Sequence, residues 1–132
     1  MTDSADELAI DELIARFFEC FDNDSGSPRL DELSDLCTPD ARFAKAGGPL
    51  ESLTQFIGPR KAKLSGGRVT QFRERETSSA TLVVSDCAQR TSTYEKSWVE
   101  AGHHINGTGH KFFHLVCTDD GWRIISTLWQ DD

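Results

Sequence analysis

Four histidines lie within twelve residues of the chain: His103, His104, His110 and His114. Imidazole nitrogens are common zinc ligands, so this cluster raises the question of a metal site. In a β-strand, however, His110 and His114 lie about 13 Å apart, whereas zinc binds each of its ligands at about 2 Å. Their spacing suits one metal ion only on a helix, and Gly107 and Gly109 disfavour a helix there. We therefore predict no metal site.

Catalysis without a metal needs a titratable group inside an apolar pocket. Asp40 and His114 are the two candidates, and each has a simpler explanation. Asp40 follows a proline at a predicted helix-to-strand junction, where local capping is common, and His114 falls on a predicted interface face. Three glutamates alternate with basic residues, which predicts cross-strand charge pairs: Glu74, Glu76 and Glu95. The sequence thus shows no isolated carboxylate on an apolar face.

Aromatic and basic side chains alternate in the segment that ends at residue 98. On a strand, four of them share one face: Arg90, Tyr94, Lys96 and Trp98. Positive groups beside aromatic walls suit an anionic or phenolic small molecule. The alternative is that the basic stems cover the core while their charged ends reach solvent. The residues predicted to line a pocket are Tyr94, Trp98, Phe113, Trp122 and Arg90.

Two helices are predicted before residue 40. The first begins near Asp6 and ends before residues 23–26, because apolar residues follow helical spacing: Ile10, Leu13, Ile14, Phe17, Phe18 and Phe21. A second, shorter helix begins at Ser27-Pro28. A short strand is expected to follow at residues 41–46.

A third helix is predicted from a capping box formed by Ser52 and Gln55. It ends at Gly66-Gly67, because glycine readily adopts the conformation that closes a helix. Pro59 lies inside this segment and lacks a backbone N–H. We therefore expect a kink or a restart there.

From residue 68 onward, apolar residues recur with the spacing that is typical of β-strands. Four strands are predicted near residues 69–79, 81–99, 108–118 and 122–130. Asp120-Gly121 and Asn106-Gly107 are the two strongest turn signals, because glycine accepts the positive φ of a tight hairpin. Alternatively, Ser85-Asp86 is the first hairpin turn, and residues 69–84 form one bulged strand.

Strand alternation across the last hairpin assigns the two faces of the sheet. The face towards the helices carries Phe113, Leu115, Cys117, Trp122, Ile124, Ser126 and Leu128. The opposite face carries His110, Phe112, His114, Val116, Arg123, Ile125, Thr127 and Trp129. The apolar groups on this second face are too many to leave bare in a soluble domain. We therefore predict a homodimer that forms through the sheet, with Phe112, His114, Ile125 and Trp129 at its interface.

The length, charge and composition of the chain argue against several classes of function and partner. A length of 132 residues fits one domain, residues 1–132, and a net charge of -8 disfavours nucleic acid and anionic membranes as partners. The four cysteines lack metal or disulfide spacing. The opening residues lack a secretory core, so we expect a cytoplasmic protein with reduced thiols. Phosphate-cradling and dinucleotide motifs are missing, and we expect no cofactor.

Three segments carry a resemblance to a known family: ELIARFFECFD at 12–22, LCTPDARF at 36–43, and GTGHKFFHLVCTDDGWRIISTLWQDD at 107–132. They resemble nuclear transport factor 2-like proteins, which include polyketide cyclase-like and ketosteroid isomerase-like members with a cystatin-like α+β fold. The resemblance implies a cone-shaped half-barrel, in which N-terminal helices pack on a strongly curved antiparallel sheet. It also implies a pocket between the helices and the concave sheet, and frequent dimers.

The expected function is accordingly that of a homodimeric small-molecule-binding domain. One alternative is a cofactor-independent isomerase, cyclase or dehydratase that uses acid–base catalysis. A second alternative is a protein-interaction module, because this fold does not by itself fix an activity.

Overall fold

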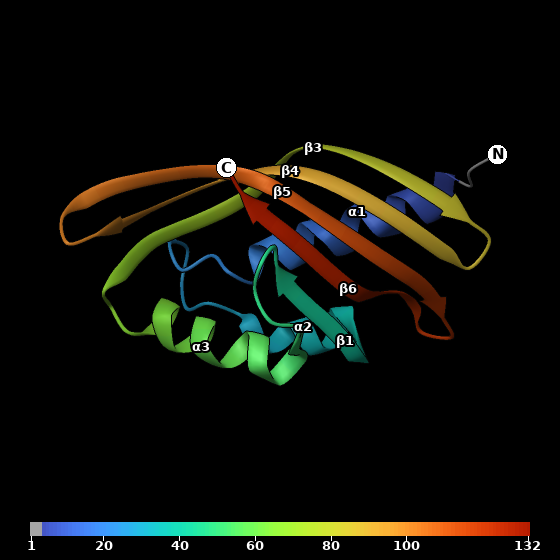
Figure 1. The fold of residues 1–132 in the computed structure, drawn as a ribbon, viewed down its shortest axis with the longest axis horizontal. Helices are drawn as coiled ribbons and strands as arrows, with labels where there is room; N and C mark the ends of the chain where they lie inside the picture. Colours follow the sequence, from blue (N-terminus) through green and yellow to red (C-terminus); the bar gives the residue numbers. More distant parts are fainter. Residues whose placement is uncertain (1–3) are drawn as a thin grey trace.

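A strongly curved sheet covers the helices on its concave side, as Figure 1 shows. The computed structural model describes residues 4–132. Residues 1–3, part of the opening segment in which we expect no secretory core, lie outside the described range. The helical segments are α1 (Ser4–Glu19), a 3₁₀ turn (Leu30–Glu32), α2 (Leu33–Leu36) and α3 (Leu53–Ser65). The strands are β1 (Cys37–Lys45), β2 (Glu51–Ser52), β3 (Val69–Val84), β4 (Cys87–Glu100), β5 (His103–Thr118) and β6 (Gly121–Asp131).

The apolar stripe of α1 forms the centre of the core. All six residues of the predicted stripe are buried, from Ile10 to Phe21. Phe17 meets the ring of Phe113 edge to face at 5.1 Å between centroids, a favourable geometry for aromatic pairs. The helix begins at Ser4, two residues before the predicted start. Sequence periodicity thus predicted this element and its buried face.

The second predicted helix is shorter than expected. Instead of a helix from Ser27-Pro28, the chain forms a 3₁₀ turn and a single turn of α2. Its apolar residues Leu30, Leu33 and Leu36 are nevertheless buried. The strand that follows begins at Cys37, four residues earlier than predicted, and includes Pro39.

The capping box of α3 is confirmed. Gln55 N–H donates to Ser52 Oγ at 3.2 Å, and Ser52 N–H donates to Gln55 Oε1 at 2.9 Å. The expected restart at Pro59 is wrong, because α3 runs from Leu53 to Ser65 as one helix. Proline removes one backbone donor, and the Arg60 guanidinium donates to the Phe56 carbonyl at 3.0 Å in the same turn.

The hairpin between β3 and β4 follows the alternative prediction. Residues 69–84 form one strand with two register shifts, and the turn is Ser85-Asp86, where Ser85 has a φ of 53°. The predicted turn at Asn106-Gly107 is wrong, because the chain turns at Ala101-Gly102. The predicted turn and the observed turn each contain two residues and differ in position by an odd number. Either turn pairs even-numbered residues of β4 with odd-numbered residues of β5. The predicted faces of Tyr94 and Trp98 are therefore retained.

A β-bulge reverses the faces in the second half of β6. The register shifts between His114 and Leu115, so that Ile125 is the extra residue in β6. Beyond it, Thr127 and Trp129 are buried under the helices, and Leu128 is exposed. The prediction that Trp129 lies on the outer face with Ile125 is therefore wrong, as is the inward position predicted for Leu128.

The sheet order is β2-β1-β6-β5-β4-β3. Neighbours pair antiparallel except β1 and β6, which are parallel, so the sheet is mixed rather than purely antiparallel. The fold is α+β, with the helices on the concave face of an open, curved sheet (Figure 1). Among the helices within residues 4–132, none is long and apolar enough to cross a bilayer.

Candidate functional site

A cavity of about 210 Å³ lies between α3, the end of α1 and the concave face of the sheet. Pockets for drug-sized ligands measure about 300–1,000 Å³, so the cavity suits a smaller molecule. Its lining residues are Phe21, Lys45, Phe56, Arg60, Lys63, Leu64, Val69, Phe72, Glu74, Tyr94, Lys96, Trp98, Lys111, Trp129 and Asp131.

Aromatic rings form much of the cavity wall. Phe56 of α3 stacks on Phe43 at 4.3 Å and meets Trp129 edge to face at 5.5 Å. On the other side of the cavity, the ring centres of Phe72 of β3 and Trp98 of β4 lie 5.8 Å apart. The inward turn of Trp129 depends on the β6 bulge, so the bulge completes the wall.

Positive charges outnumber negative ones around the cavity. The cationic residues are Lys45, Arg60, Lys63, Lys96 and Lys111, and the carboxylates are Glu74 and Asp131. The lining therefore has an excess of three positive charges, although the whole chain has a net charge of -8. Low-dielectric walls strengthen such a local field, which attracts anions into the cavity.

Lys111 and Glu74 form the deepest ion pair. Their side chains are 9% and 8% exposed, and Lys111 Nζ lies 2.8 Å from Glu74 Oε1. The two atoms are within ion-pair distance, but Glu74 Oε1 has no well-directed hydrogen bond, so the contact is chiefly electrostatic. Burial lowers the pKa of the Lys111 amine, and Glu74 opposes this change. The ammonium also lies 4.2 Å from the centre of the Tyr94 ring.

A second polar cluster surrounds Asp131 near the end of β6. The Tyr94 hydroxyl donates to Asp131 Oδ1. Lys96 Nζ lies 2.9 Å from the same oxygen, and Lys45 Nζ lies 3.3 Å from Oδ2. Burial acts to raise the pKa of Asp131, but hydrogen bonds from Tyr94 and Lys96 outweigh it and lower the pKa to about 2. Burial and then the Asp131 contact raise the pKa of the Tyr94 phenol.

Two glycines of β5 make room for this cluster. Gly109 pairs with Tyr94, and Gly107 pairs with Lys96. A Cβ at Gly109 would collide with the Tyr94 phenol and lie 2.6 Å from the Gln130 carbonyl oxygen. A Cβ at Gly107 would lie 3.2 Å from Lys96 Cε. The missing side chains therefore let Tyr94 and Lys96 cross β5 towards Asp131 on β6.

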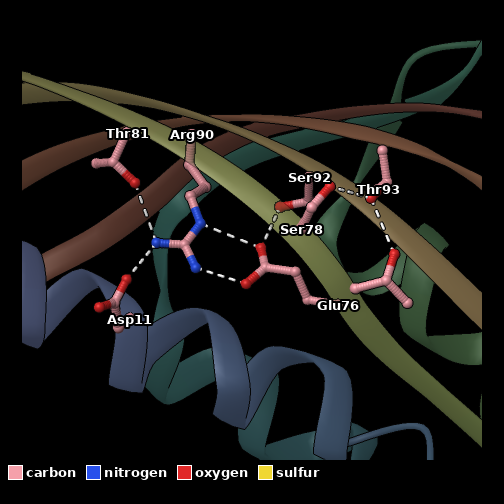
Figure 2. Close-up of polar contacts among 8 residues, drawn as sticks. Asp11, Glu76, Ser78, Thr81, Arg90, Ser92 and Thr93 are labelled. Atoms are coloured by element: carbon pink, nitrogen blue, oxygen red, sulfur yellow. Dashed lines mark hydrogen bonds and ion pairs between the residues drawn. The ribbon is translucent and has the colours of Figure 1, made fainter.

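Arg90 lies outside the cavity, in a buried network that joins β3 and β4 to α1 (Figure 2). Its guanidinium binds both carboxylate oxygens of Glu76, at 2.6 and 3.1 Å. It also donates to Asp11 Oδ1 at 2.5 Å and to Thr81 Oγ1 at 3.0 Å. Ser92 donates a further hydrogen bond to Glu76. The Asp11 contact thus holds α1 against the sheet, while the bonds to Glu76 and Thr81 tie β4 to β3.

The other predicted pocket residues are divided between cavity and core. Tyr94 and Trp98 line the cavity. Phe113 is fully buried against α1, and the Trp122 indole N–H donates to Asp6 Oδ1 at 3.0 Å. Neither of these two residues lines the cavity, because both lie under α1 rather than under α3.

The two predicted catalytic candidates lie away from the cavity. Asp40 is exposed on β1, and His114 is exposed on the convex face, where its Nδ1 lies 3.3 Å from Ser126 Oγ. Phe112 and Ile125 share the convex side and are 44% and 40% exposed. Within residues 4–132, no group of three or more His, Cys, Asp or Glu side chains is placed to bind one metal ion.

Sequence reasoning found Lys96 but missed the other charged groups that line the cavity. The cross-strand charge pairing predicted for Glu95 is confirmed, because it meets Arg75 at 2.5 Å. Glu74 also pairs with a cation on another strand, Lys111, but it is a buried carboxylate that faces the cavity. Lys111 was not singled out, although it lies two residues from inward-facing Phe113 and so shares its face. That alternation was the signal that could have found it.

No family profile matches the chain, and no curated protein sequence matches it. Solved structures do match. A conserved protein from Planctomyces limnophilus aligns with a TM-score of 0.84 and 20% identity, covering 98% of each chain. A nuclear transport factor 2-like superfamily protein from Salmonella enterica aligns with a TM-score of 0.80 and 18% identity, covering 96% of this chain and 90% of that one.

A third match names the architecture. It is a nuclear transport factor 2-like protein with a cystatin-like fold from Novosphingobium aromaticivorans, with a TM-score of 0.77 and 19% identity. The alignment covers 96% of this chain and 81% of that one. These matches agree with the curved sheet and with the helices on its concave face. The chain therefore has the nuclear transport factor 2-like fold.

Proposed function

We propose that the protein binds a small anionic ligand with a flat apolar body in the cavity under α3. The observation that carries this proposal is the excess of cationic over acidic side chains around a space with aromatic walls. The flat body would pack against Phe56, Trp98 and Trp129, and the anion would approach the buried ammonium of Lys111.

Lys111 is the donor best suited to this role. An ammonium has three N–H donors, and Glu74 is its ion-pair partner within the described residues. The rest of the ammonium is surrounded by the faces of Tyr94, Trp129 and Phe18, at 4.2 to 5.8 Å. A carboxylate or phenolate oxygen would supply the acceptor that these rings lack, and such charge-assisted hydrogen bonds are strong.

Arg60 is placed to help bind the ligand anion from the α3 side of the cavity. Its guanidinium lies 3.9 Å from the centre of the Phe56 ring and 5.2 Å from that of Trp129. Glu51 lies 4.0 Å from it, at the limit of an ion pair. Burial lowers the pKa of Arg60, although the group stays charged.

The first test compares benzoate with its neutral isostere benzamide. Trp98 and Trp129 both line the cavity, so their fluorescence reports occupancy, and calorimetry gives the affinity. We expect benzoate to bind about tenfold or more tightly than benzamide, which corresponds to about 1.4 kcal/mol. Equal affinities, or no binding of either probe, would contradict the proposal.

Two neighbouring cations on α3 provide a matched pair of variants. Arg60 lines the cavity, whereas Lys61 points away and pairs with Asp31 at 2.6 Å. Arg60→Met should weaken benzoate binding about tenfold, while Lys61→Met should leave it unchanged. An equal loss in both variants would show a general charge effect rather than a site under α3.

A second candidate function is acid–base catalysis, and Glu74 is the observation that favours it. A buried carboxylate without a well-directed hydrogen bond at Oε1 is a suitable proton acceptor. Lys111, 2.8 Å away, would stabilise negative charge that develops on a substrate oxygen. This arrangement fits removal of a proton next to a carbonyl group.

Proton exchange tests the catalytic candidate. In D₂O, the protein should accelerate deuterium incorporation next to the keto group of phenylpyruvate, followed by NMR. Glu74→Gln should remove the acceleration, and Asp40→Asn should not, because Asp40 is exposed on β1. A rate equal to that of buffer alone, with phenylpyruvate bound, would leave the domain a binding module.

We also propose that a second copy of the chain covers the convex face. Phe112 and Leu128 are cross-strand neighbours there, 44% and 47% exposed, and Ile125 is 40% exposed. Exposed apolar groups that are contiguous on a sheet favour a partner surface. Light scattering at micromolar concentration should give twice the monomer mass, and Leu128→Asp should halve it. A monomeric wild-type protein would contradict this proposal.

A further inference from the structure

We propose that Asp131 determines the class of ligand, by restricting the cavity to anions with a single charged group and an uncharged opposite end. This inference rests on the proposed function and adds to it. The carboxylate of Asp131 already occupies the cationic end of the cavity near β1 and β4, so a second ligand anion would have to compete with it for Lys45 and Lys96.

Three donors converge on this one side chain. The Tyr94 hydroxyl and the Lys96 ammonium both reach Asp131 Oδ1, and Lys45 reaches Oδ2. These donors come from β4 and β1, which lie on either side of the β5–β6 pair. The cavity therefore contains a complete carboxylate-binding arrangement, and the bound carboxylate belongs to the chain itself.

The surrounding backbone is adapted to this arrangement. Tyr94 and Lys96 reach Asp131 only by crossing β5, and they cross it at Gly109 and Gly107. The Tyr94 phenol occupies the space that any side chain at Gly109 would fill. The next residue, Asp132, is tied to Thr108 by two hydrogen bonds, at 2.7 and 2.9 Å. Asp131 is thus held in place from both sides.

The two ends of the cavity consequently differ in what they offer. At the Asp131 end, Lys45 and Lys96 are both ion-paired with one carboxylate, which presents acceptor oxygens. At the other end, Lys111 and Arg60 carry donors towards the aromatic walls. A ligand that fits both ends has one anionic group and, opposite to it, an apolar edge or a hydroxyl or amine that donates to Asp131.

The test compares two probes of one shape, benzoate with one carboxylate and isophthalate with two. In the wild-type protein, benzoate should bind about tenfold or more tightly than isophthalate. In Asp131→Asn, the released Lys45 and Lys96 should accept the second carboxylate, so that isophthalate gains about tenfold while benzoate changes by less than about threefold.

Asp132→Asn is the matched control. It removes the same charge from the next residue, whose side chain contacts Thr108 and His110 and does not line the cavity. This variant should leave the ratio of the two affinities unchanged. A similar change of ratio in both variants would assign the effect to overall charge and overturn the inference.

The double variant Asp131→Asn with Lys96→Met identifies where the second carboxylate binds. If the inference holds, this double variant loses most of the isophthalate gain, while an unchanged circular dichroism spectrum verifies that the fold is intact. If isophthalate binds the wild-type protein as tightly as benzoate does, Asp131 does not select the ligand. Failure of both probes to bind would instead refute the proposed function itself, so the two failures are distinguishable.

Discussion

Two buried ion pairs lie on the concave face of one sheet, and they have different surroundings. Glu74 and Glu76 are two residues apart on β3, and each binds a cation from a neighbouring part of the sheet, Lys111 of β5 or Arg90 of β4. Arg90 and Lys111 are almost equally buried, with side chains 4% and 9% exposed. The burial of the cation therefore does not distinguish the two pairs, although the Glu74 side chain is 8% and the Glu76 side chain 20% exposed.

The number of satisfied donors does distinguish them. Arg90 donates to Glu76, Asp11 and Thr81, and it does not line the cavity under α3. Lys111 has Glu74 and aromatic faces around it, and it lines a cavity. A charged group whose hydrogen-bond donors mostly have acceptors stabilises the fold. A charged group with donors that lack an acceptor can still bind a ligand.

The largest effect on stability should come from the pair of Arg90 and Glu76. Arg90→Met removes a buried cation from the partly buried Glu76 carboxylate, which should lower the free energy of unfolding by about 3 kcal/mol. Urea unfolding followed by circular dichroism measures this. Arg75→Met is the control, since its exposed ion pair with Glu95 should contribute less than about 1 kcal/mol. Equal losses of unfolding free energy in Arg90→Met and Arg75→Met would contradict the proposed structural role of the Arg90 network.

A smaller effect is expected at the glycine beneath the Asp131 cluster. Gly109→Ala places a methyl group against the Tyr94 phenol and the Gln130 carbonyl, which should cost about 1–3 kcal/mol through overpacking. Gly107→Ala meets only the flexible end of Lys96 and should cost less. Urea unfolding of both variants tests the ranking. A larger loss for Gly107→Ala would contradict the role given to Gly109.

The pH dependence of stability should show a modest contribution from Asp131. Its folded-state pKa of about 2 lies below its ordinary value of 3.8. The contribution is therefore complete above about pH 4 and is lost as the pH falls towards 2. Since the carboxylate is partly exposed, we expect about 1 kcal/mol. Asp131→Asn should flatten this part of the unfolding curve, and an unchanged acid dependence would contradict the assignment.

Much of the fold was predictable, because local patterns determine it. The helical stripe from Ile10 to Phe21 and the capping box at Ser52 each depend on residues close in sequence. The faces of Tyr94 and Trp98 were right even though the adjacent turn was placed five residues too late. Alternation along a strand depends on parity, and both turns preserve parity.

The cavity was less predictable, because it depends on features without a local signal. The bulge at Ile125 carries no glycine or proline, yet it turns Trp129 inward and Leu128 outward. Glu74 and Lys111 are 37 residues apart in sequence and meet only in the folded sheet. Gly107 and Gly109 suggested a turn, whereas their role is to let two side chains cross a strand.

The most direct test exchanges each ion pair for a neutral pair of similar shape. Both double variants, Glu74→Gln with Lys111→Met and Glu76→Gln with Arg90→Met, leave the net charge unchanged. The first should keep the free energy of unfolding within about 1 kcal/mol of wild type and weaken benzoate binding about tenfold or more. The second should lose about 3 kcal/mol of stability and keep benzoate affinity within about twofold. Unweakened benzoate binding in the first variant would contradict the claim that the pair of Lys111 and Glu74 is the binding site.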